Sequence, residues 1–212
     1  MRAASDNPRI LLATTNAHKI EEIVEMLDRE RLKVQVLSLL DFPQLVMPEE
    51  TGSTFEENAL LKARFAAEET GLISLADDSG LEVEALNGAP GVHSKRFAGD
   101  NADDARRYGK LLDMMKDIPD QERQARFRCC IVIFVPPGDS TVVEGVCRGS
   151  IARAPRGENG FGYDPVFVPE GYSSTMAELT MEEKNRISHR ARALEAALPE
   201  IRRLLKHSLP AG

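Results

Sequence analysis

The longest apolar run in the chain, Cys129–Val135, constrains the fold more than any other feature of the sequence. It is apolar at every position and stops at Pro136 and Pro137. A strand that is apolar on both faces belongs inside a sheet that is covered on both sides. The run is also far shorter than the roughly 18 residues that a membrane span needs. We therefore expect a core built around a central strand, and no membrane partner.

Strand-like and helix-like segments alternate before this run. Residues 10–13 are apolar and lead through a polar turn into a segment in which Ile20, Ile23 and Leu27 recur at helical spacing. Residues 32–36 alternate between apolar and polar side chains, as in a half-buried strand. Alternating strands and helices predict an α/β fold.

A second helix is predicted by the spacing of Thr54 and Glu57, which is that of a capping box. Alanines then run down one face of the helix as far as Gly71, a residue type that often ends helices. Residues 72–76 form the next apolar strand. We expect this strand to end in a turn at residues 77–80.

Two strands in the second half of the chain are predicted to form a hairpin. Residues 125–135 and 140–147 flank a Pro-Pro-Gly-Asp turn. Amphipathic helices are expected at residues 105–115 and 194–205. A hairpin among strand–helix units favours a mixed sheet over a parallel one. The fold class predicted is therefore α/β, with a mixed central β-sheet flanked by helices.

Length, charge and cysteine usage restrict the function. A chain of 212 residues fits one domain, which we place at residues 9–212 after a flexible lead-in at residues 1–8 that lacks the apolar segment of a signal peptide. The net charge of −7 opposes long-range attraction to nucleic acid, so we expect a small anionic ligand and no nucleic-acid polymer. The three cysteines lack metal-ligand spacing and are expected to be buried thiols in a reducing cytoplasm.

The polar turn at residues 14–19, Thr-Thr-Asn-Ala-His-Lys, has the features of an anion site. It leaves a strand and opens a helix, whose first N–H groups lack partners within the helix. Lys19 adds a positive charge in the first helical turn. A phosphate is a ligand that fits there. An ordinary helix cap beside a solvated lysine would use the same residues, so the turn alone does not decide between the two.

Asp77 and Asp78 follow an apolar strand, and their adjacent carboxylates repel each other. A cation such as Mg²⁺, which takes oxygen ligands, would hold such a pair. Glu50, or Glu49 beside it, could supply a further oxygen from the loop before the alanine-rich helix. The alternative is a turn stabilised by an aspartate side chain and leading into Ser79.

Two segments late in the chain supply groups that suit a nucleobase. Residues 160–165, Gly-Phe-Gly-Tyr-Asp-Pro, place aromatic rings among glycines, which suits stacking on a base, although the rings could equally fill a small core. Lys184, His189 and Arg190 offer three hydrogen-bond donors. On one continuous helix Lys184 and His189 would lie roughly 140° apart, so we expect a break, with Ser188 capping a new helix at His189.

Taken in order, these segments resemble the inosine triphosphate pyrophosphatase family, whose bacterial members are the non-standard purine (dITP/XTP) pyrophosphatases. The similarity covers about residues 9–206, and several motifs in sequence are far more specific than any one of them. The first loop carries His18 where many relatives have glycine. The matching segments are residues 13–19, 50–63, 76–81, 88–94, 160–165 and 183–190.

The resemblance implies two lobes with the active site in the cleft between them. It implies Asp78 as the catalytic proton acceptor, and Glu50, Asp77 and Asp78 as ligands of a Mg²⁺ cofactor. The substrate-binding residues that it implies are Thr14, Thr15, Asn16, Ala17, His18 and Lys19 for the triphosphate, Ser79 for the nucleotide, Phe161, Gly162, Tyr163 and Asp164 for the base and sugar, and Lys184, His189 and Arg190 for the edge of the base.

The enzyme implied by the resemblance is a cytoplasmic homodimer that hydrolyses the small-molecule substrates ITP, dITP and XTP to the monophosphate and pyrophosphate. Hypoxanthine and xanthine carry an oxygen acceptor at position 6, which cationic donors satisfy, whereas the amino group of adenine leaves those donors unpaired. Guanine shares that oxygen, so its exclusion has to come from elsewhere. Two alternatives stay open: a pyrophosphatase for other modified nucleotides, and a nucleotide sensor without turnover.

Overall fold

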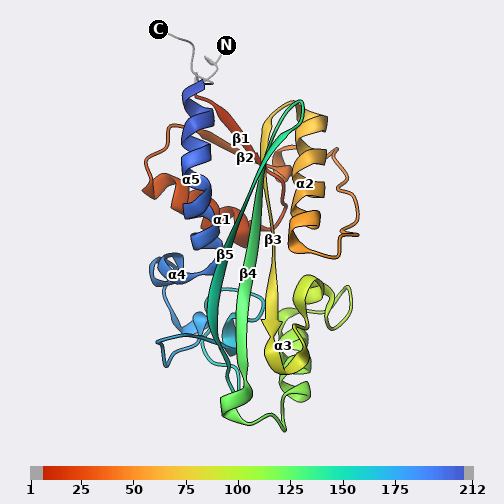
Figure 1. Cartoon of the computed structure of the whole chain (residues 1–212), viewed down its shortest axis with the longest axis vertical. Helices are drawn as coiled ribbons and strands as arrows, with labels where there is room; N and C mark the ends of the chain where they lie inside the picture. The colour runs from red at the N-terminus through yellow and green to blue at the C-terminus, as the bar shows by residue number, and fades with distance from the viewer. Residues whose placement is uncertain (1–6, 208–212) are drawn as a thin grey trace. The chain divides into compact units, whose positions relative to one another are not determined.

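The computed structural model describes residues 7–207, so most of the lead-in predicted at residues 1–8 lies outside the described residues. Within this range the chain forms a six-stranded sheet in the order β2-β1-β3-β4-β5-β6. The strands are β1 (Arg9–Leu12), β2 (Gln35–Ser38), β3 (Ile73–Val83), β4 (Gln124–Val135), β5 (Asp139–Ile151) and β6 (Phe167–Pro169). The helices are α1 (Ala17–Arg29), α2 (Phe55–Thr70), α3 (Asp104–Met114), α4 (Met181–Ile187) and α5 (His189–His207) (Figure 1).

The sheet is mixed, as predicted. β1 is parallel to both β2 and β3, with Leu11 opposite Leu37 on one side and opposite Ser74 on the other. β5 and β6 are antiparallel, with Ser150 opposite Val168. The parallel pairs arise because helical connections carry the chain back before each new strand, whereas a tight turn joins β4 directly to β5.

β4 is the central strand that the apolar run predicts. Its neighbours in the sheet are β3 and β5, and residues 129–134 are all buried. Cys129, Cys130 and Cys147 are buried thiols outside any disulfide, as the sequence predicts. Among the described residues, no helix combines the length and the apolar character that crossing a membrane requires.

The described residues divide into two compact units. Unit 1 takes residues 7–77, 130–143 and 193–207, and unit 2 takes residues 78–129 and 144–192. The chain passes from unit 1 to unit 2 within β3, between its two adjacent aspartates. The single domain expected at residues 9–212 and the cleft between two lobes both stay predictions.

In unit 1, α1 starts in the predicted polar turn, and α2 begins and ends where the sequence predicts. Asn16 is the N-cap of α1 and accepts a hydrogen bond from the N–H of Lys19. Thr54 and Glu57 form the predicted capping box of α2, and Gly71 ends that helix in a left-handed conformation with φ of 68°. The alanines of α2 are buried, because small side chains allow the helix to pack closely. β2 begins only at Gln35, later than the alternation at residues 32–36 suggests.

Unit 2 has its own hydrophobic core. Its members include Leu81 of β3, Leu111 of α3, Phe127 of β4 and Phe167 of β6. The buried guanidinium of Arg123 adds a polar anchor, donating hydrogen bonds to the carbonyl oxygens of Met115, Ile151 and Ala152. These bonds tie the end of α3 to the end of β5. Buried polar groups in folded proteins are almost always hydrogen-bonded in this way.

The turn predicted at residues 77–80 is wrong. β3 continues without interruption from Ile73 to Val83, and both Asp77 and Asp78 are buried within it. A run of aspartate, serine and glycine usually leaves the core because a buried carboxylate loses its hydration. Here Asp77 forms an ion pair with Lys19 of α1, and this tertiary contact compensates for the lost hydration.

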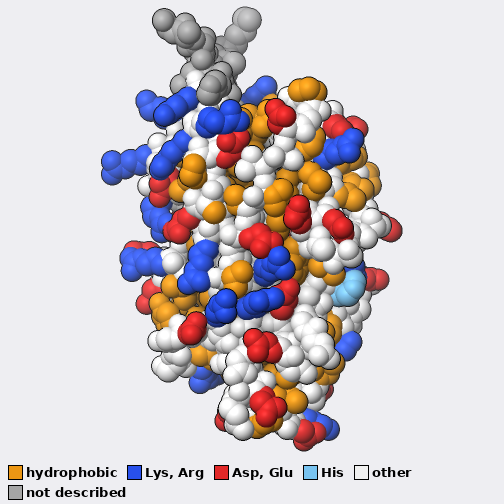
Figure 2. Space-filling model, viewed as in Figure 1, with side chains coloured by type: hydrophobic (Ala, Val, Ile, Leu, Met, Phe, Trp, Pro, Cys, Tyr) orange, Lys and Arg blue, Asp and Glu red, His pale blue; other side chains and the backbone are white. Residues whose placement is uncertain are grey.

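The solvent-exposed surface carries charges of both signs. On unit 2, Arg126 pairs with Glu82, and Arg128 pairs with Glu144 on the neighbouring strand. Figure 2 shows Lys and Arg side chains interspersed with Asp and Glu on the face in view.

Candidate functional site

The polar turn predicted to bind phosphate lies in unit 1, between β1 and α1. The hydroxyl oxygen of Thr14 accepts a hydrogen bond from the N–H of Asn16 at 3.1 Å, and the Asn16 side chain caps the helix. Thr15, Ala17 and His18 are exposed, and the first turn of α1 carries no acidic side chain. The turn therefore serves as a helix cap and also presents an accessible helix N-terminus that suits an anion.

Lys19 connects this turn to the aspartate pair. Its Nζ lies 2.9 Å from Oδ2 of Asp77, whose side chain is 0% exposed, against 16% for Lys19. The parallel register explains the contact, because Leu12 lies opposite Leu75 and the residues that follow each therefore come side by side. Two motifs that are far apart in the sequence meet in this way. Their convergence at neighbouring parallel strands is the usual location of binding sites in α/β folds.

A second lysine–carboxylate pair in unit 1 involves Glu50. Its Oε1 accepts a hydrogen bond from Nζ of Lys62 at 2.9 Å, and Lys62 is buried on α2 among the alanines. Sequence reasoning missed Lys62, although it lies within one of the matching segments. The sequence signal for it is a lysine on the alanine-lined, buried face of a predicted helix. Lysine is rarely buried unless it is paired, so this position indicates a carboxylate partner.

The donors at these positions fit a magnesium ion chemically. Glu50, Asp77 and Asp78 offer only carboxylate oxygens, the ligands that Mg²⁺ accepts. Lys19 pairs with Asp77 and Lys62 pairs with Glu50, so the two lysines neutralise part of the negative charge of these carboxylates. Over residues 7–207 no cluster of three or more His, Cys, Asp or Glu side chains is arranged to hold a metal, so the full ligand set stays a prediction.

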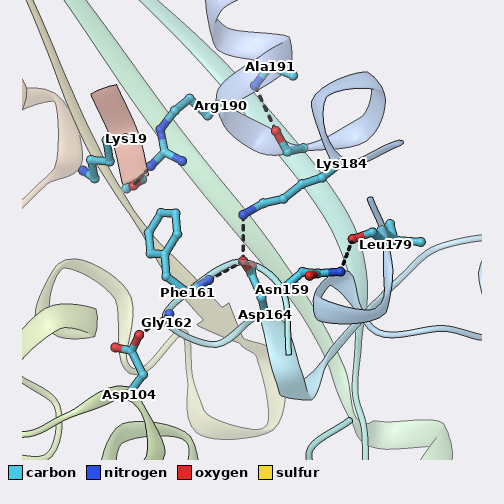
Figure 3. A network of polar contacts seen from close by, with 12 residues as sticks. Lys19, Asp104, Asn159, Phe161, Gly162, Asp164, Leu179, Lys184, Arg190 and Ala191 are labelled. Atoms are coloured by element: carbon cyan, nitrogen blue, oxygen red, sulfur yellow. Dashed lines mark hydrogen bonds and ion pairs between the residues drawn. The ribbon is translucent and has the colours of Figure 1, made fainter. Parts of the chain in front are cut away.

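Unit 2 holds the residues predicted to read the base (Figure 3). Nζ of Lys184 lies 2.7 Å from Oδ2 of Asp164, and both side chains are 4% exposed. The same carboxylate accepts a hydrogen bond from the N–H of Phe161 at 2.9 Å. The Phe161 ring lies beside two cations, with its centroid 4.7 Å from Nζ of Lys184 and 5.7 Å from Cζ of Arg190. An aromatic face and two cationic donors thus share one location.

The predicted helix break at Ser188 is confirmed. α4 ends at Ile187, Ser188 is extended with φ of −66° and ψ of 155°, and α5 begins at His189. The Ser188 hydroxyl oxygen accepts a hydrogen bond from the N–H of Ala191 at 3.1 Å, as a capping residue does. The change of chain direction lets residues on α4 and α5 approach the same aromatic ring.

Arg190 and His189 have different surroundings. Arg190 is 1% exposed and donates a hydrogen bond from Nη2 to the Ser79 hydroxyl at 3.1 Å, which brings Ser79 to the predicted base-reading residues. His189 is also buried, and its ring stacks on Phe127 with centroids 4.7 Å apart. Its observed packing is therefore that of a core residue, and its contact with a base stays a prediction.

The two aromatic residues of the loop at residues 160–165 differ: one fills the core, and the other is available to stack on a base. Tyr163 is buried in the core of unit 2 and donates a hydrogen bond from its hydroxyl to the Ser94 carbonyl at 2.9 Å, and burial raises its pKa. Phe161 is only partly buried and faces the cations. Gly162 donates its N–H to Oδ2 of Asp104 at 2.7 Å. Asp104 was not predicted, because no local pattern marks an aspartate that contacts a loop so distant in sequence.

Comparison with known proteins places these residues in a family. The sequence matches the model of the Ham1 family over residues 10–200. The chain belongs to the Ham1 family. Proteins called dITP/XTP pyrophosphatase in Desulforamulus reducens and in Mycobacteroides abscessus are each 49% identical to it. The first alignment covers 94% of this chain and 98% of the relative, and the second covers 93% and 96%.

Solved structures of other Ham1 proteins have the same fold. The HAM1 protein of Coxiella burnetii superposes with a TM-score of 0.83 at 46% identity, covering 92% of this chain and 99% of that one. The Ham1 protein of Staphylococcus aureus gives a TM-score of 0.80 at 39% identity, covering 92% and 98%. The fold class and the resemblance drawn from the sequence are both confirmed.

Proposed function

We propose that this Ham1-family protein hydrolyses deaminated purine nucleoside triphosphates, namely ITP, dITP and XTP, to the nucleoside monophosphate and pyrophosphate. The observation that carries the proposal is the placement of two buried cations, Lys184 and Arg190, beside the ring of Phe161. Relatives that are nearly half identical over almost their whole length are called dITP/XTP pyrophosphatases. The proposed role is to clear these nucleotides from the cytoplasmic pool and so keep their bases out of DNA and RNA.

The cationic donors account for selection of the base. Lys184 and Arg190 can donate to the oxygen at position 6 of hypoxanthine or xanthine while the base stacks on Phe161. Adenine presents an amino donor at that position, so it would leave buried donors unpaired. A site built on such hydrogen bonds can discriminate by about 10⁴-fold. The Asp164–Lys184 pair supports this role, because it orients the lysine before the base arrives.

The residues of unit 1 and Asp78 would handle the triphosphate. The helix N-terminus after β1 and Lys19 bind its oxygens, because N–H groups and an ammonium complement phosphate charge. Glu50, Asp77 and Asp78 would hold Mg²⁺, which neutralises charge on the phosphates when bound. Lys62 keeps the Glu50 carboxylate oriented.

The proposed reaction needs no covalent intermediate. A water oxygen forms a bond to the α-phosphorus, and the bond from that phosphorus to the bridging oxygen breaks. The leaving pyrophosphate keeps the electron pair, and Asp78 accepts the proton of the water. A carboxylate bound tightly to a metal is a poor base at the same moment, so one of the two roles of Asp78 is exercised through a neighbouring group.

The test is pyrophosphate release from a panel of triphosphates with Mg²⁺ and with excess EDTA. We expect ITP, dITP and XTP to exceed ATP by at least about 100-fold in kcat/KM, and EDTA to stop turnover. Equal turnover of ATP would overturn the proposed specificity. Tight binding of ITP without magnesium-stimulated pyrophosphate release would identify a sensor, and a preference for modified pyrimidine triphosphates would identify a different substrate class.

We further propose, on the family resemblance, that the protein is a homodimer. Sedimentation equilibrium of the full chain is expected to give twice the mass of one chain. A mass of one chain across the accessible concentration range would contradict the proposal.

A further inference from the structure

The loop that presents Phe161 is held by two carboxylates from different parts of unit 2. Asp164 lies within the loop and accepts the N–H of Phe161 at 2.9 Å. Asp104 lies at the start of α3 and accepts the N–H of the next residue, Gly162, at 2.7 Å. Figure 3 shows Asp104 beside Gly162, on the side of the loop away from Lys184. The two successive amides are thus fixed from two directions.

Gly162 makes this second contact informative. Its φ of 66° is in the left-handed region, which only glycine adopts readily, so the loop backbone follows a special path at this position. Hydrogen bonds from a backbone N–H to an ionised carboxylate are about twice as strong as neutral ones. A bond of this kind can hold the loop in one backbone conformation, where the local sequence alone would allow several.

Asp104 is not needed to cap its own helix. The N-cap of α3 is the preceding residue, Asp103, whose Oδ1 accepts the N–H of Arg106 at 2.8 Å. The carboxylate of Asp104 instead uses Oδ2 for Gly162 and Oδ1 for an ion pair with Arg107. Its position at the N-terminus of α3 also suits an acidic side chain, since the helix dipole attracts negative charge there.

We propose that Asp104 is a positioning residue for base recognition: its carboxylate holds the Gly162 amide and thereby keeps the Phe161 ring beside Lys184 and Arg190. The proposal rests on the proposed function, because it assigns Asp104 to the same base-reading site. Asp104 acts through the loop and does not touch the base.

The test compares Asp104→Ala, Asp104→Asn and the matched control Asp103→Ala in full-length protein. Asp104→Ala should raise KM for ITP about tenfold, the effect of losing one charge-assisted hydrogen bond, and should lower the preference for ITP over ATP. kcat should change by less than about threefold, because the reacting phosphates are not involved. Asp104→Asn keeps an oxygen acceptor and should recover part of the loss.

Asp103→Ala weakens the same helix end without touching the loop, so it should lower the melting temperature and leave KM near that of the wild type. A wild-type KM and wild-type base preference in Asp104→Ala would overturn the proposal. So would an equal rise in KM in Asp103→Ala, because the effect would then come from the helix as a whole.

A second measurement is independent of activity. The chain contains no tryptophan, so the variant Phe161→Trp carries a single fluorescent reporter in the loop. Adding Asp104→Ala to this background should shift its emission maximum to longer wavelength, and adding Asp103→Ala should not. An unchanged emission would overturn the positioning role. Absence of ITP hydrolysis in the wild type would count against the proposed function alone, since the fluorescence comparison remains valid.

Discussion

Asp78 is the residue on which the proposed chemistry depends most. It is 7% exposed and lies in the middle of β3, one residue after the ion-paired Asp77. A carboxylate at this position can accept a proton, whereas an amide of nearly the same size cannot.

We expect Asp78→Asn to lower kcat for ITP by about 10³-fold, within the range typical of general-base residues. Steady-state pyrophosphate release measures the effect, and equilibrium binding of ITP checks that the site persists. Glu82→Gln is the matched control, because Glu82 lies on the same strand and pairs with Arg126 on the surface. Unchanged kinetics in Asp78→Asn would remove Asp78 from the mechanism.

Cys147 gives a prediction about pH at the same scale. Burial raises the pKa of its thiol to about 11 from an ordinary value of 9.0. The unfolded chain therefore loses this proton at lower pH than the folded chain does, so rising pH favours unfolding. The stabilisation is complete below pH 9 and is lost between pH 9 and pH 11, amounting to about 2 kcal/mol.

Urea unfolding at intervals from pH 8 to pH 11 measures this loss in the wild type and in Cys147→Ala. The variant should start from a lower free energy of unfolding and lose less of it over that pH range. Parallel curves for the two proteins would show that Cys147 does not contribute. Burial also raises the pKa of Tyr163, so Tyr163 should contribute to the loss of stability near pH 11 in the wild type and in the variant alike.

Helix ends are the features that local sequence predicts best. The caps at Thr54 and Ser188 lie where the sequence places them, and Asn16 caps α1 within the polar turn at residues 14–19. A cap depends on a side chain and an N–H group only two or three residues away. The end of β3 was misplaced for the opposite reason. Its continuation through Asp77 depends on Lys19, which is distant in the sequence.

Two glycines, one at the end of α2 and one inside α3, test this argument at the scale of the element. Gly71 ends α2 with φ of 68°, whereas Gly109 lies inside α3, and at neither residue would an added Cβ meet a neighbouring atom within 4 Å. Gly71→Ala should lower the free energy of unfolding by about 1 kcal/mol, because alanine is strained in a left-handed conformation. Gly109→Ala should raise it by about 0.5 to 1 kcal/mol through better helix propensity.

Thermal or urea unfolding of the two variants measures these opposite signs under one protocol. Each variant is the control for the other, since both add a single methyl group where there is space. A destabilising Gly109→Ala, or a neutral Gly71→Ala, would show that packing outweighs backbone conformation at these positions.

At the scale of the whole molecule, one proposed magnesium ligand and the base-reading residues belong to different units. Glu50 and its partner Lys62 belong to unit 1, whereas Arg190 and Phe161 belong to unit 2, as Asp78 does. The separation of Glu50 from Arg190 implies that magnesium dependence and base selection can be changed separately.

We expect Glu50→Gln to raise the Mg²⁺ concentration for half-maximal activity about tenfold or more for every nucleotide, with the ratio of ITP to ATP turnover unchanged. Arg190→Ala should reduce that ratio about tenfold or more and leave the Mg²⁺ requirement unchanged, because it removes a donor to the base. Magnesium titrations with both nucleotides measure both quantities. Since Arg190 is buried, the assays are run well below the melting temperature of the variant. A change in both quantities in either variant would contradict the division.

The sequence by itself determined the α/β class, the central strand, the helix caps and the family, because each depends on local spacing or on short motifs read in order. Only the tertiary structure decided which charged groups meet. These contacts depend on strand register and on burial, which make an isolated carboxylate costly and a paired one tolerable. The pairs decided in this way are Lys19 with Asp77, Lys62 with Glu50, Lys184 with Asp164 and Gly162 with Asp104.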